Sequence, residues 1–200
     1  MNRRLIAGLL AIAATGLLQA QGQDLTKAES TAMEKKLAAI IERGARAPAP
    51  AAQPLKTPIS ERELNAYLKF SQQVQMPPGL ASPIFTIADG NRVAAKAMLN
   101  LDALRKSKPR GWTDPLGYVS GSVEVAVSGL LYASKGRGVF QLQSATLGGV
   151  SLPKALLQEI VSFYTKTPEH PNGWDMDSPF DLPQKIRQID VQRGGATIIQ

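Results

Sequence analysis

The chain has 200 residues, no cysteine, a single histidine (His170) and a formal net charge of +7. These counts exclude disulfides, thiolate chemistry and histidine-rich metal sites. Five Phe, four Tyr and two Trp give little material for a nucleic-acid stacking platform. Because the balance is basic, we expect contact with anionic surfaces such as lipid headgroups, and no binding of nucleic acid.

The first 20 residues have the pattern of a secretory signal peptide. Arg3 and Arg4 precede an uncharged apolar run from Leu5 to Leu18. The run is shorter than the roughly 20 apolar residues that a membrane span requires. We therefore expect cleavage near Ala20 and a periplasmic or secreted protein, with a retained anchor as the alternative.

Residues 21–43 predict an amphipathic helix in which Met33, Leu37, Ile40 and Ile41 share one face. A Pro/Ala-rich linker, residues 44–58, follows and is too poor in apolar side chains to fold alone. We expect this helix to lie outside the main domain, residues 59–200, or to dock loosely on it. It would serve as a spacer, or reach a partner or a membrane surface.

The main domain opens with a strong helix-start signal. Ser60 and Glu63 have the spacing of a capping box, and Ile59 and Leu64 that of a hydrophobic staple. The apolar stripe then continues through Tyr67 and Leu68, and we expect the helix to end at the Pro77-Pro78 pair.

Alternating apolar residues then predict three β-hairpins. The first runs over residues 84–101 around Asp89-Gly90-Asn91, the second over 118–147 and the last over 186–199. Between the second and the last, Leu152-Pro153 opens a helix that reaches Lys166, with an apolar stripe wide enough to predict burial on more than one side. This order predicts an α+β domain whose antiparallel strands curve around helices or pack on them.

Two loops carry clustered polar residues. His170, Asp175, Asp177 and Asp181 could hold Ca²⁺ weakly, but their spacing lacks the closing Glu of a calcium loop and equally suits an ordinary turn. We therefore predict no metal site. Around the 106–115 loop, a basic-aromatic patch suits lipid headgroups or a membrane surface, with a merely solvated loop as the alternative: Arg105, Lys106, Lys108, Arg110 and Trp112.

Three segments resemble the LmeA-like envelope proteins: Ser60 to Leu68, the junction from Leu147 to Pro153, and Leu182 to Gly195. Members of that family bind phospholipid, and the family is similar to the tubular lipid-binding (TULIP-type) folds. The resemblance covers residues 55–200 and implies a curved antiparallel sheet wrapped on or around a long helix. It carries over no ligand-contacting residue, because the matching motifs are structural junctions.

We therefore expect a non-enzymatic protein without cofactor that binds or transfers lipid in an apolar groove, with phospholipid as the expected class. Burial of alkyl chains needs no catalytic motif. The alternatives are an envelope scaffold or assembly protein with no small-molecule ligand and, less favoured, a metal-assisted hydrolase using the loop from Asp175 to Asp181. The candidate groove residues are Leu64, Leu68, Phe85, Ile87, Val123, Val125, Val127, Leu156, Ile160, Val161 and Tyr164.

Overall fold

The computed structural model describes residues 24–46, 53–74, 76, 78–106, 120–167 and 171–200. The expected signal peptide lies outside these residues. Within them the chain forms an α+β fold of four helices and one antiparallel sheet of nine strands. This confirms the predicted fold class at the level of a curled antiparallel sheet with helices.

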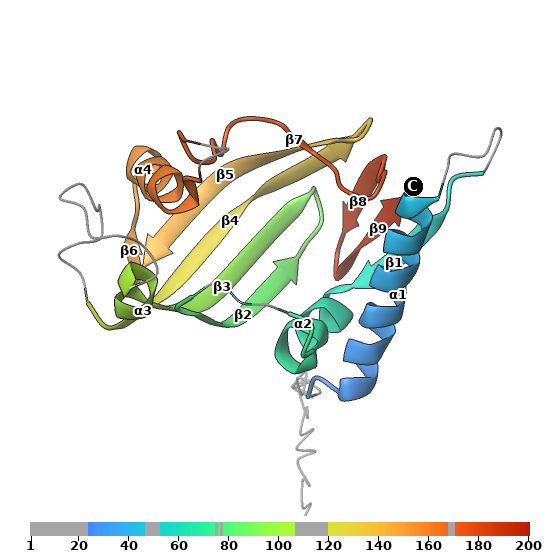
Figure 1. The fold of residues 1–200 in the computed structure, drawn as a ribbon, viewed down its shortest axis with the longest axis horizontal. Helices are drawn as coiled ribbons and strands as arrows, with labels where there is room; N and C mark the ends of the chain where they lie inside the picture. The colour runs from blue at the N-terminus through green and yellow to red at the C-terminus, as the bar shows by residue number, and fades with distance from the viewer. Residues whose placement is uncertain (1–23, 47–52, 75, 77, 107–119, 168–170) are drawn as a thin grey trace, which may run out of the picture.

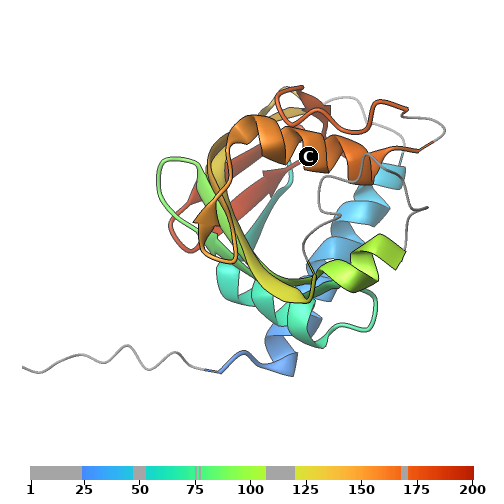
Figure 2. The same ribbon diagram turned by 90° about the vertical axis from the view of Figure 1, so that its left-hand side faces the viewer.

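Four consecutive strands form the main wall of the sheet (Figure 1). They are β2 (Leu80–Ile87), β3 (Arg92–Asn100), β4 (Ser122–Ser134) and β5 (Arg137–Leu147), each antiparallel to the next. The first two predicted hairpins are thereby confirmed. Viewed from the side, the wall curls into a half-barrel (Figure 2), and β-bulges where the register shifts, as between Ser128 and Gly129, favour such curvature.

The remaining strands extend the wall at the far end of β4. There β4 continues past β3, and Ala133 pairs with Ile189 of β8 (Gln188–Gln192). β8 forms the predicted last hairpin with β9 (Gly195–Ile199), and β9 pairs with β1 (Lys56–Ser60). The sequence predicts linker at residues 56–58, but pairing with β9 makes them strand. Two short strands, β6 (Val150–Ser151) and β7 (Phe180–Asp181), pair with β5.

Helix α2 (Glu61–Phe70) begins where the capping box predicts. The Ser60 hydroxyl accepts from the Glu63 N–H at 3.2 Å, and the Ser60 N–H donates to the Glu63 carboxylate at 2.9 Å. The helix ends at Phe70, earlier than the predicted stop at Pro77-Pro78. The Ser71 hydroxyl accepts from the Gln73 N–H at 3.2 Å, a local bond that competes with further helix.

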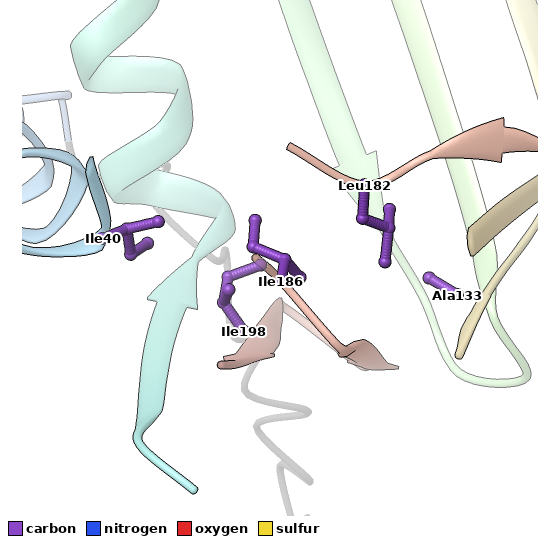
Figure 3. Packing of buried hydrophobic residues seen from close by; sticks show 5 residues of the cluster. All are labelled: Ile40, Ala133, Leu182, Ile186 and Ile198. Atoms are coloured by element: carbon purple, nitrogen blue, oxygen red, sulfur yellow. The ribbon is translucent and has the colours of Figure 1, made fainter. Parts of the chain in front are cut away.

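Helix α1 (Lys27–Ala45) covers the predicted amphipathic segment and packs against α2. Its Ile40 is buried in a cluster with Ile186 and Ile198 from the C-terminal part of the chain (Figure 3). The Gln200 side-chain amide donates to the Ile40 carbonyl oxygen at 2.9 Å. The expectation of a separate or loosely docked helix is therefore wrong, because the apolar residues of α1 complete this cluster.

Two further helices flank the half-barrel. Helix α3 (Leu101–Lys106) replaces the predicted end of the β3 strand, because the Asn100 side chain accepts from the Ala103 N–H at 2.8 Å and so caps a helix. Helix α4 (Lys154–Thr165) confirms the predicted helix and lies on the β5 side of the wall (Figure 1).

Candidate functional site

The concave face of the half-barrel is an apolar surface made by cross-strand rows. Strand pairing places Phe85, Ala95, Val127 and Ala145 side by side across β2, β3, β4 and β5. The neighbouring rows on the same face are equally free of charge: Ile87, Val93, Gly129 and Leu142; Ala97, Val125 and Leu147; Leu80, Leu99 and Val123. The period-2 pattern of the strands produces this face, since every second side chain points to it.

Helix α4 closes one side of this face. Leu157 is buried in a cluster with Ala145 of β5 and Met176. Val127 and Val161, two of the predicted groove residues, pack against the same cluster. The contact between α4 and the sheet therefore exists where the sequence interpretation placed the groove.

Much of the apolar surface around this contact remains partly exposed. Of the apolar side chains of α4 only Leu157 is buried, and Leu156 is 37% exposed. The sheet covers one face of α4, and the segment before β7 lies along a second, where the Gln158 side chain donates to the Trp174 carbonyl and accepts from the Met176 N–H, both at 3.0 Å. Other predicted groove residues are only half-buried: Phe85, Val123, Val125, Ile160 and Tyr164. Across the described residues Leu101 is the one large side chain that is fully buried.

One of the predicted groove residues on α2 belongs to a different surface. Leu68 lines a cleft of about 430 Å³ between α2 and the first half of β2. Leu64 is half-buried on the same helix. Ile87, at the end of β2, is buried. The sequence pattern showed that these residues were apolar but not which of two surfaces they would join.

Helix α2 also seals the edge of β2, which sequence reasoning missed. The buried Asn65 amide accepts from the Phe85 N–H at 2.7 Å and donates to the Phe85 carbonyl at 2.8 Å. The Glu61 carboxylate accepts from the Ile87 N–H at 2.6 Å. The sequence offered one signal for this contact, the polar Asn65 close to the capping box. Its partner Phe85 lies 20 residues further along the chain, so the local pattern did not identify it.

The predicted headgroup patch is described only in part. Arg105 and Lys106 lie in the last turn of α3, and the Lys106 side chain is exposed. Lys108, Arg110 and Trp112 lie outside the described residues. The structure therefore places the start of this patch at the end of the half-barrel where β3 finishes and β4 begins (Figure 1).

The acidic loop forms a turn with separate ion pairs. The Asp175 carboxylate accepts from the Ser178 hydroxyl at 2.7 Å and from the Asp177 N–H at 3.0 Å, and these bonds lower the pKa of Asp175. Asp177 pairs with Lys154 at 2.5 Å. Asp181 faces Arg137 of β5 at 3.5 Å, and His170 lies outside the described residues. Within the described ranges, no group of three or more His, Asp or Glu side chains is arranged to hold a metal ion.

Comparisons with protein-family models, with curated proteins and with solved structures found no match for this chain. In the described part of the chain no helix has both the length and the apolar character needed to cross a bilayer.

Proposed function

We propose that this protein binds or transfers lipid in the groove between α4 and the concave face of the half-barrel. The observation that carries the proposal is the state of that face: rows of uncharged side chains from four strands, most of them partly exposed, next to an apolar helix that packs on β5. Completing the burial of such a surface is favourable, and an alkyl chain can do so.

The energy of binding would come from the chain of the lipid and not from a motif. Each CH₂ group moved from water to an apolar site gains roughly 0.8 kcal/mol before the cost of ordering the ligand. Small residues in the rows, such as Ala95 and Ala97, leave more room against the sheet than large ones would. Because binding of this kind needs no catalytic motif, we propose a non-catalytic role without cofactor.

The sequence supports the cellular setting of this role. The apolar run after Arg3 and Arg4 is typical of export, and the resemblance to LmeA-like proteins favours a phospholipid of a bacterial-type envelope as ligand. We propose that α4 takes the place of the helix that the sheet wraps in TULIP-type folds. The predicted headgroup patch, which begins at the end of α3, would contact the anionic headgroup or the membrane surface.

The alternative, a scaffold that reaches a partner through its N-terminal helix, is less favoured. Two apolar side chains of α1 that would bind a partner are used within the chain, since Met33 and Ile40 are 3% and 4% exposed, and Ile41 is the exposed one at 53%. Binding a partner through that face would require α1 to leave α2 and the C-terminal hairpin.

Uptake of a fluorescent phospholipid by the purified full chain tests the proposal. Ile160→Asp places a charge under α4, and Val125→Trp fills the groove without adding charge; we expect both to reduce uptake at least tenfold. Tyr132→Asp is the control, because Tyr132 is 43% exposed and points to the other side of β4. Normal uptake by both groove variants, with circular dichroism showing that they fold, would refute the placement of the lipid site between α4 and the concave face.

A further inference from the structure

The cleft between α2 and β2 is separate from the lipid site that we propose under α4. Along β2, Phe85 points to the concave face, and its neighbour Ile84 points to the other side, where it is paired in register with Lys96. Ile84 lines the cleft together with Leu68, and neither residue belongs to the buried clusters under the half-barrel. The cleft thus opens at the outer edge of the sheet.

The walls of the cleft are mostly apolar. Leu25, Leu68, Met76, Pro83 and Ile84 supply them, and Ile84 is 58% exposed although it lies in a strand. The volume of about 430 Å³ falls within the ~300–1,000 Å³ of small-molecule sites. An exposed isoleucine beside four other apolar side chains leaves a surface that an alkyl chain would cover.

A bulge in β2 creates this opening. The register with β3 shifts between Ala81 and Ile84, and Ser82 has a φ of 49°. Pro83 has no N–H to donate, so the strand cannot continue its ladder there. The bulge turns the start of β2 away from regular pairing and leaves room between it and α2.

The polar groups of the cleft differ in what they can offer a ligand. Both ends of the Asn65 amide are engaged by the Phe85 backbone. Lys69, in contrast, has an exposed side chain whose ammonium lies 5.1 Å from the centre of the Phe70 ring, and within the described part of the chain no carboxylate pairs with it. Among the described residues that line it, the cleft therefore combines an apolar floor with one available cation, Lys69, at its rim.

We propose that this cleft binds an amphiphile with a single alkyl chain and an anionic head, such as a long-chain fatty acid. The chain lies against Leu68, Met76 and Ile84, and the head pairs with Lys69 at the rim. The site does not depend on the groove under α4, because it is built from α2, the bulge of β2 and the segment before α1.

Equilibrium dialysis of the full chain with palmitate, laurate and hexadecylamine tests the site. Palmitate should bind at least tenfold more tightly than laurate, because four more CH₂ groups are buried, at roughly 0.8 kcal/mol each before losses. Ile84→Glu should weaken palmitate binding about tenfold or more. Ile41→Glu is the matched control, since Ile41 is 53% exposed on α1 and outside the cleft.

The head group is tested by Lys69→Gln. The variant should weaken palmitate by about two- to fivefold, as for an exposed ion pair, and should not weaken hexadecylamine. Phospholipid uptake, measured in parallel, should stay unchanged in Ile84→Glu and fall in Ile160→Asp, which separates this cleft from the groove. Palmitate affinity in Ile84→Glu within about twofold of the original chain would overturn the proposal, as would equal losses for both ligands in Lys69→Gln.

Discussion

The Lys36 ammonium of α1 lies 2.7 Å from each carboxylate oxygen of Glu63 in α2. Glu63 is also the residue that completes the capping box of α2 with Ser60. The relationship is reciprocal, because Glu29, which completes the capping box of α1, accepts from Arg62 of α2 at 2.7 Å. Each helix therefore supplies the cation that pairs with the capping carboxylate of the other.

Removing Lys36 should loosen α1. We expect Lys36→Met to lower the free energy of unfolding by about 1–2 kcal/mol, because Glu63 is only 16% exposed and would lose a charged hydrogen-bond partner. Urea denaturation provides the measurement. Glu42→Gln, which breaks an exposed pair with Arg46 at the C-terminal end of α1, is the control and should change stability by less than about 0.5 kcal/mol.

Acid should release α1 over a defined pH range. Hydrogen bonds from Arg62 and from the Thr26 backbone lower the pKa of Glu29 to about 2. Burial would raise the pKa of Glu63, but the hydrogen bonds from Lys36 and Ser60 outweigh it, so this pKa is lowered too. Lowered pKa values mean that the ionised carboxylates stabilise docking above their ordinary pKa, near 4.5, and that this contribution is lost as the pH falls towards the folded values.

Hydrogen exchange of the α1 amides across pH tests this. After correction for intrinsic exchange, we expect constant protection from pH 7 to about 5 and a progressive loss below it, while the strands stay protected longer. In Glu29→Gln, the protection of the α1 amides should depend less on pH in the acid range. Loss of α1 protection between about pH 7 and 5.5 would contradict these assignments.

Asn65 should be important for the edge of β2. Asn65→Leu removes both bonds to Phe85 and leaves its N–H and carbonyl without a partner at a buried position. We expect a loss of roughly 2–3 kcal/mol in thermal or urea unfolding. Gln188→Ala, which removes an exposed side-chain bond to Asp190, is the comparison and should be nearly neutral. An equal effect of the two substitutions would show that α2 does not seal the edge.

Two glycines should respond differently to alanine. A Cβ at Gly129 would lie 2.4 Å from the Gln141 carbonyl oxygen, so Gly129→Ala should distort the β4–β5 bulge and cost about 3 kcal/mol. At Gly148, φ is +58°, and an added Cβ would meet nothing within 4 Å. Only backbone strain of about 1 kcal/mol is therefore expected for Gly148→Ala. Calorimetric unfolding of both variants distinguishes crowding from strain.

Local patterns in the sequence predicted the local structure. The capping box at Ser60 and Glu63, the turn at Asp89-Gly90-Asn91 and the apolar helix after Leu152 were all found, because each signal lies within a few residues. Contacts between distant segments were not predictable in this way. The pairing of Ala133 with Ile189 and the bond of Asn65 to Phe85 depend on how the chain folds back.

The same distinction applies to the candidate site. Alternation along β4 predicted that Val123, Val125 and Val127 share a face, and strand register agrees. Periodicity did not predict how α2 is buried: Asn65 and Ala66 are its buried residues, and Leu68 lines an outer cleft. A helix pattern shows which side chains are apolar, whereas the tertiary partner decides which of them are covered.

The central claim is that the space between α4 and the concave face accepts a lipid chain. Native mass spectrometry of the full chain purified from a bacterial host tests it directly, with Ile160→Asp prepared in parallel. The account predicts a bound species of phospholipid mass on the original chain that is absent from the variant. A folded original chain that carries no lipid and acquires none from phospholipid vesicles would contradict it.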